Sequence, residues 1–183
     1  PNVSVVRLID SGLKTGMIEY VLYNVLRYHR RMPDYAQQQN KALWIERSQS
    51  VPSERRIGIL GLGEIGLACA EALNRLGFDV IGWSRSKKEI LNVGCFYGDE
   101  SLKPFLSQSH ILICLLPLTP ETQGILNRVT LAALPAGSYL INVGRGEHLM
   151  EEDLLDALNN GHIAGATLDV FREEPLGKDN PFW

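Results

Sequence analysis

The fold is decided by residues 57–66, which read Ile-Gly-Ile-Leu-Gly-Leu-Gly-Glu-Ile-Gly. The first four residues form a short apolar run that is typical of a buried strand. Gly61, Gly63 and Gly66 follow with the spacing G-x-G-x-x-G, and a helical pattern from Ile65 to Leu76 continues from them. A glycine motif alone is weak evidence, but its place between a strand and a helix indicates a βαβ unit that binds a dinucleotide.

Each glycine has its own part in this prediction. Gly61 permits the tight turn, Gly63 lets a pyrophosphate approach the backbone, and Gly66 allows the helix to pack closely on the strand. The backbone N–H groups near Glu64 and Ile65 would then face the anion, and the helix dipole would favour it. The alternative is a glycine-rich turn in an α/β domain that binds nothing.

Outward from this motif, short apolar runs recur along the chain with predicted helices between them. The runs are Asp79–Trp83, Ile111–Leu116, Tyr139–Val143 and Ala164–Val170, and the helices are predicted around Ser101–Ser107, Arg128–Leu134 and Glu151–Asn159. Strands that alternate with helices in this way are typical of a parallel sheet covered on both faces. The predicted fold class is therefore α/β, a Rossmann doubly wound parallel sheet.

The part of the chain before residue 55 has a different pattern. Val3–Ile9 is a possible strand, and Met17–Arg31 is predicted as a helix whose apolar residues form one stripe from Ile18 to Leu26. Residues Tyr35–Glu54 show no sustained period and are interpreted as a connecting arm. The stripe either covers the sheet of this domain or takes part in an interface.

Composition and charge narrow the classes of partner. The formal net charge of -3 supplies no field that would attract nucleic acid or an anionic membrane, and 45% hydrophobic with 21% charged residues is ordinary for a soluble globular protein. The apolar runs are far shorter than the roughly 20 residues that a membrane span needs. Cys69, Cys95 and Cys114 are odd in number and have apolar neighbours, which favours reduced thiols and a cytoplasmic location. No metal site is predicted, and the expected partner is a small molecule.

The end of the second predicted strand bears on the choice of nicotinamide cofactor. An Asp or Glu at this point accepts hydrogen bonds from the ribose hydroxyls of NAD. This chain instead has Ser84 and Arg85, followed by Lys87 and Lys88. These groups suit a 2′-phosphate, so the sequence predicts a preference for NADPH over NADH. The alternative is a solvated basic turn.

The chain resembles the D-isomer-specific 2-hydroxyacid dehydrogenase family, and most closely its glyoxylate/hydroxypyruvate reductase A branch. The resemblance rests on five motifs in the order and spacing of that family. They are Gly61-Leu-Gly-Glu-Ile-Gly66, Trp83-Ser-Arg85, Leu115-Leu-Pro-Leu-Thr-Pro-Glu-Thr122, Ile141-Asn-Val-Gly-Arg-Gly146 and Leu168-Asp-Val-Phe-Arg-Glu-Glu-Pro-Leu176. The resemblance implies an enzyme that reduces small 2-keto acids to D-2-hydroxy acids.

The resemblance also implies roles for particular residues. Arg145 would bind and polarise the keto acid, and Glu174 would pair with a catalytic histidine that donates a proton. Asp169 would contact the nicotinamide carboxamide, while Leu116, Pro117 and Val143 would line the nicotinamide end of the cleft. Taken alone, Arg145 could equally form a surface salt bridge, and Glu173 with Glu174 could be a solvated acidic turn.

On the same resemblance the chain divides into three parts: residues 1–14 as a remnant of a substrate domain, 15–54 as an interdomain helix and arm, and 55–183 as the NAD(P)-binding domain. The catalytic histidine of the family lies beyond the motif that contains Glu174, so the chain as given is expected to bind cofactor without turnover. His148, near Arg145, is interpreted as a turn residue and not as the acid. A homodimer that uses the helix and arm is expected. The alternative function is a dinucleotide-sensing dimerisation module of the corepressor kind.

Overall fold

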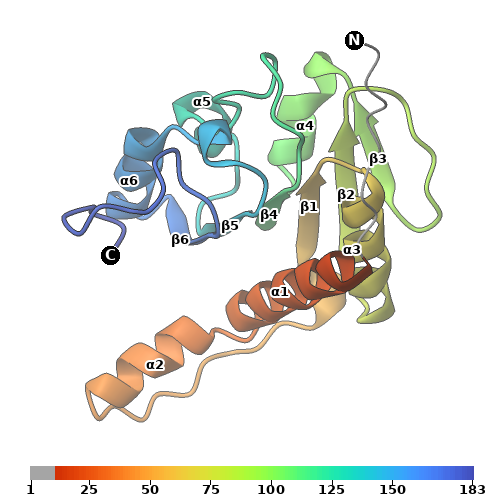
Figure 1. Ribbon diagram of the computed structural model, residues 1–183. Helices are drawn as coiled ribbons and strands as arrows, with labels where there is room; N and C mark the ends of the chain where they lie inside the picture. Colours follow the sequence, from red (N-terminus) through yellow and green to blue (C-terminus); the bar gives the residue numbers. More distant parts are fainter. Residues whose placement is uncertain (1–10) are drawn as a thin grey trace.

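The computed structural model describes residues 11–183 and contains one parallel sheet (Figure 1). Its six strands have the order β3-β2-β1-β4-β5-β6, and every neighbouring pair is parallel. The strands are β1 (Arg56–Leu60), β2 (Asp79–Ser84), β3 (Gly94–Tyr97), β4 (Ile111–Cys114), β5 (Ser138–Asn142) and β6 (Ile163–Leu168). This order is that of a Rossmann doubly wound sheet, so the predicted fold class is confirmed.

Helices cover both faces of the sheet, because the strands are apolar on both sides. The helices are α1 (Ser11–His29), α2 (Met32–Asn40), α3 (Glu64–Arg75), α4 (Leu102–Leu106), α5 (Arg128–Ala132) and α6 (Glu151–Asn159). Along β4, Ile111 and Ile113 join the core beneath α1 and α3, whereas Leu112 and Cys114 join the core beneath α4, α5 and α6. Side chains alternate between the faces of a strand, so β4 contributes to both cores.

Helix α1 packs against the last two strands of the sheet. Val21 and Val25 are fully buried, and the ring of Tyr28 stacks on that of Tyr139 with centroids 4.3 Å apart. The Tyr28 hydroxyl lies 2.7 Å from the Thr167 hydroxyl, which in turn donates to Asn24 at 3.1 Å. The central part of the predicted apolar stripe therefore covers the sheet of its own chain.

Apart from shifts of one or two residues at the ends of other elements, the structure differs from the sequence predictions in three places. Helix α1 begins at Ser11, six residues before the predicted start at Met17. The arm predicted over Tyr35–Glu54 contains most of α2, whose polar Gln37-Gln-Gln39 run hid the helix, and a 3₁₀ turn at Pro52–Glu54. Strand β3 was not predicted, since it is a four-residue, half-exposed strand at the edge of the sheet.

The predicted strand Val3–Ile9 and most of the predicted substrate-domain remnant lie outside the described residues. Within residues 11–183, no helix is long and apolar enough to cross a membrane. The same part of the chain holds no group of three or more His, Cys, Asp or Glu side chains that could bind a metal ion.

Candidate cofactor site and active site

The predicted functional residues gather at one edge of the sheet. All six strands are parallel, so their carboxyl ends meet at this edge, and each predicted site residue lies at or shortly after such an end. Ligands of open α/β sheets bind at this edge, where the direction of winding reverses. In this sheet that reversal lies between β1 and β4.

The glycine turn lies at the end of β1 and is closely packed. Gly61 has a φ of +102°, and a Cβ atom there would lie 2.7 Å from the Leu115 carbonyl oxygen. A Cβ at Gly66 would lie 2.0 Å from the Gly61 carbonyl oxygen. A Cβ at Gly63 would meet no atom within 4 Å. Positions 61 and 66 thus require glycine for backbone packing, while position 63 opens onto free space in front of the helix.

Helix α3 begins directly behind this open space. Its N-cap is Gly63, which offers no side chain to the first-turn amides at Glu64 and Ile65. Uncapped amides and the helix dipole favour an anion at this position. The Lys88 ammonium donates to the Leu62 carbonyl oxygen at 2.6 Å and so places a positive charge on the glycine turn. The residues present therefore fit the pyrophosphate of a dinucleotide.

The four residues predicted to bind a 2′-phosphate have different surroundings after β2. Ser84 is buried and its hydroxyl donates to the Ser86 carbonyl at 2.8 Å, and Lys87 pairs with Glu89 at 3.0 Å. Lys88 binds the glycine turn, as described above. Arg85 is exposed. The pKa of Glu121, in the loop that follows β4, is lowered, first by a hydrogen bond with Thr119 and to a smaller extent by the charge of Arg85, so Arg85 lies close enough to this loop to act on it electrostatically.

The predicted nicotinamide end consists of the loops after β4, β5 and β6. Leu116 and Val143 are buried, and the Pro117 carbonyl accepts a hydrogen bond from the Thr122 hydroxyl at 2.7 Å. The Asp169 amide donates to the Asn142 carbonyl at 3.0 Å, which extends the contact between β5 and β6. The pKa of Tyr20 on α1 is raised, first by burial and then by the Asp169 charge and a hydrogen bond to that carboxylate. Helix α1 thus contacts this end of the site.

Arg145 lies in a turn whose backbone is held by buried polar side chains. Asn142 is fully buried, and it accepts from the Gly144 amide at 3.2 Å and donates to the Arg145 carbonyl at 3.3 Å. His148 is fully buried and accepts from the Arg145 amide at 3.0 Å. The Arg145 side chain is exposed and donates to the Gly144 carbonyl at 2.8 Å. The guanidinium is therefore presented to solvent from a fixed backbone.

The Glu174 turn lies next to the Arg145 turn. A Cβ at Gly146 would lie 1.9 Å from the Phe171 carbonyl carbon, so the two backbones are in direct contact. Glu174 is exposed, and its carboxylate accepts from the Phe171 amide at 2.9 Å. Glu173 is exposed as well and lines a separate shallow pocket with Glu151 and Lys178. The structure thus places the turns of Arg145 and Glu174 side by side.

Two residues of this site were not recognised from the sequence, Asn142 and His148. Two features of the sequence could have pointed to them: Asn142 is a polar residue at the end of an apolar run, and His148 is a histidine three residues after Arg145.

The thiol of Cys114 lies at the end of β4, but burial raises its pKa to about 12, and burial raises that of Cys69 to about 11. Both thiols stay protonated, so neither is suited to nucleophilic chemistry.

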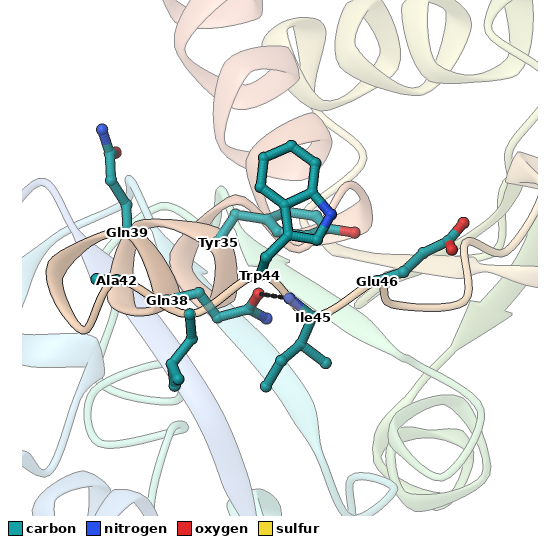
Figure 2. Close-up of a pocket in the computed structure, with 8 residues that line it drawn as sticks. Tyr35, Gln38, Gln39, Ala42, Trp44, Ile45 and Glu46 are labelled. Carbon is teal, nitrogen blue, oxygen red and sulfur yellow. Dashed lines mark hydrogen bonds between the residues drawn. The ribbon is translucent and has the colours of Figure 1, made fainter.

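A hollow lies away from this edge. It has a volume of about 870 Å³ and is lined by residues of α2 and the following arm, from Tyr35 to Glu46 (Figure 2). The indole of Trp44 is fully exposed beside it, and the Gln38 side chain accepts from the Ile45 amide at 3.2 Å. The hollow carries none of the predicted site residues.

A doubly wound sheet with a glycine turn at the end of its first strand defines a Rossmann domain of the dinucleotide-binding class. A family model described as "D-isomer specific 2-hydroxyacid dehydrogenase, NAD binding domain" matches residues 22–183. The chain belongs to this family, which confirms the resemblance drawn from its motifs.

Known relatives agree with this assignment. The chain is 48% identical over 182 residues to glyoxylate/hydroxypyruvate reductase A of Yersinia enterocolitica, and 47% identical over 185 residues to the protein of that name from Photorhabdus laumondii. Each alignment includes 100% of this chain and 58% of the relative. The chain thus spans well under two thirds of the length of these relatives.

Solved structures of the family superpose closely. A D-isomer specific 2-hydroxyacid dehydrogenase of Xanthobacter autotrophicus Py2, in complex with NADPH and MES, has a TM-score of 0.97 and 46% identity, covering 100% of this chain and 76% of that one. An NADPH-dependent glyoxylate/hydroxypyruvate reductase of Sinorhizobium meliloti, in complex with NADP and sulfate, has a TM-score of 0.95 and 39% identity, covering 100% of this chain and 59% of that one.

Proposed function

We propose that the protein to which this chain belongs reduces small 2-keto acids, of the glyoxylate or hydroxypyruvate type, with NADPH. The observation that carries the proposal is the Arg145 turn, which presents an exposed guanidinium from a buried, hydrogen-bonded backbone at the ligand-binding edge. A planar guanidinium matches the carboxylate and adjacent carbonyl of a 2-keto acid. The names of the two relatives and the NADPH and NADP complexes of the two solved structures support the substrate and the cofactor.

In the proposed reaction, different residues of the chain have different roles. The nicotinamide, when bound, supplies the hydride that reduces the keto carbon. Arg145 binds the carboxylate of the acid and stabilises the negative charge that develops on the carbonyl oxygen. Glu174 holds the histidine that, in the family, gives its proton to that oxygen. The product is a D-2-hydroxy acid.

We also propose a cytoplasmic location. The buried, unpaired thiols of Cys69 and Cys114 support it, because reduced cysteines are typical of a reducing compartment.

Replacing Arg85 with alanine is expected to remove the preference for NADPH. Arg85 is an exposed cation after β2, and a charge-assisted bond to phosphate contributes enough to change affinity by about 10- to 100-fold. Calorimetric titration of this chain with NADPH and NADH measures both affinities. The matched control is Lys87→Ala, because Lys87 already pairs with Glu89 and should change the preference much less. An Arg85→Ala variant with unchanged preference would rule out this assignment.

We also infer a homodimer in which the arm contacts the partner. Trp44 is 100% exposed, and its neighbours Leu43 and Ile45 are 48% and 46% exposed. Large apolar side chains exposed together mark an interface. Trp44→Glu is expected to weaken dimerisation at least about tenfold, since it places a charge in an apolar contact. Sedimentation velocity measures this effect, with Leu91→Glu as control for an 87% exposed leucine elsewhere. Equal dimerisation of both variants would argue against this interface.

A further inference from the structure

His148 connects two loops of the candidate site. Its ring is fully buried, its Nδ1 accepts from the Arg145 amide at 3.0 Å, and its Nε2 lies 3.3 Å from the Pro117 carbonyl oxygen. The Arg145 amide can only donate and the Pro117 carbonyl can only accept. The two bonds therefore require a neutral ring with its proton on Nε2.

The ring lies where the two strands separate. The last bond that continues the pairing of β4 with β5 runs from the Val143 amide to the Cys114 carbonyl, at 3.2 Å. Beyond it, the His148 ring occupies the space in front of Gly144, where a Cβ would lie 2.8 Å from Nδ1. The imidazole thus links the Arg145 turn after β5 to the Pro117 loop after β4.

We propose that His148 is a positioning residue that sets the place of Arg145 relative to the Pro117 loop, and so relative to the nicotinamide end of the site. This inference rests on the proposed function, in which Arg145 acts on the keto acid. The bond to the Arg145 amide is the essential one, because the Pro117 carbonyl also accepts from the Thr122 hydroxyl at 2.7 Å. Without His148, the Arg145 amide would lose its acceptor inside the protein.

Protonation of the ring would break the link. An imidazolium carries a proton on both nitrogens, so its Nδ1 could not accept from the Arg145 amide. Burial lowers the pKa of His148; the bonds at Pro117 and Arg145 and the Glu147 charge oppose this, and the Arg145 charge adds to it. The pKa in the folded chain thus lies below the ordinary value of 6.5, and the stability contributed by the neutral ring is lost as the pH falls from about 6.5 through the folded value.

Three substitutions separate the two bonds. In asparagine, Oδ1 is attached to Cγ as Nδ1 is in histidine, so His148→Asn keeps an acceptor for the Arg145 amide. His148→Gln places its amide farther out, near the Pro117 carbonyl, and His148→Leu keeps neither bond. The matched control is His162→Asn, because the His162 ring also contacts a carbonyl, that of Leu131 at 3.1 Å, but before β6 at the opposite edge of the sheet.

The experiment has two readouts. Nitrogen NMR of the histidine rings in this chain is expected to show His148 as the Nε2–H tautomer at pH 7 and to show its protonation below pH 6.5. In the full-length enzyme, His148→Leu and His148→Gln are expected to lower kcat at least about tenfold, because an unpaired buried amide displaces the turn. The kcat of His148→Asn and of the His162→Asn control is expected to stay within about threefold of the wild-type value. In His148→Asn, the pH dependence of kcat should also lose the part that follows the titration of His148.

Three outcomes would overturn the proposal: the Nδ1–H tautomer, a kcat of His148→Leu equal to that of the wild type, or equal losses in the asparagine and leucine variants. If His148→Leu does not fold, the tautomer and the asparagine to glutamine contrast still decide the question. Failure of the proposed function is a separate result, since it would appear as absent NADPH binding or absent keto-acid reduction in the wild type. The tautomer would be unaffected by that failure.

Discussion

Replacing Arg145 with glutamine in the full-length enzyme is expected to lower kcat/KM for glyoxylate by about a thousandfold. Removal of one donor to a developing oxyanion costs about 10²- to 10³-fold, and Arg145 is also expected to bind the substrate carboxylate. The substitution removes the bond from the guanidinium to the Gly144 carbonyl, but the turn should keep its place, because Asn142 and His148 hold its amide and carbonyl groups. Steady-state kinetics measures the loss, and an unchanged NADPH affinity shows that the cofactor site is intact.

Two further variants test the chemistry of this position. Arg145→Lys keeps the charge but not the planar fork, so it should recover only a small part of the activity. Arg172→Gln is the matched control, because Arg172 is another exposed arginine on the neighbouring turn and contacts Met150 and Glu151. An Arg145→Gln enzyme within about tenfold of the wild type would contradict the role given to this residue, and so would an equal loss in Arg172→Gln.

Replacing Gly66 with alanine is expected to reduce the affinity of this chain for NADPH at least about 100-fold and also to lower its stability. The new Cβ would lie 2.0 Å from the Gly61 carbonyl oxygen, so α3 and the glycine turn would have to move apart. Overpacking of this kind costs about 1–3 kcal/mol of stability. Binding depends on the same geometry, because the first-turn amides of α3 must point at the pyrophosphate.

Gly63→Ala separates binding from folding. A Cβ at Gly63 meets no atom of the described chain within 4 Å, so stability should change little, whereas the affinity for NADPH should fall if a pyrophosphate approaches this backbone. Gly177→Ala is the control for an open glycine outside the site. Calorimetry measures the affinities and urea denaturation the stabilities. Wild-type affinity in both Gly63→Ala and Gly66→Ala would exclude the glycine turn as the cofactor site.

The sequence predicted those parts of the fold that depend on local patterns. Helix α6 was predicted with its observed bounds, Glu151–Asn159, because carboxylates in its first turn and a buried apolar face mark it clearly. The glycine turn was predicted for the same reason, since its spacing between strand and helix is local. Strand β3 was missed, because a short edge strand has only one neighbour to bury it and its sequence carries little pattern.

For the candidate site, the motifs predict which residues belong to it but not which groups hold its turns in place. Arg145, Glu174 and Arg85 are side chains that a motif can carry, but the groups that hold their turns are set by tertiary contacts. His148 does lie in a turn, the 3₁₀ turn Gly146–His148, but nothing in its neighbours shows that Pro117, 31 residues away, accepts from the same ring. Lys88 is predicted to bind a phosphate, and no local pattern indicates its bond to the Leu62 carbonyl, 26 residues away in the chain.

Because the Gly146 backbone lies against that of Phe171, the two turns that carry Arg145 and Glu174 share a single spacing. A side chain at position 146 would push the two turns apart, so a single substitution there would separate the proposed substrate-binding arginine from the proposed partner of the histidine. Redesign of the proposed enzyme toward a larger acid is therefore expected to succeed through other walls of the cleft, with glycine kept at position 146.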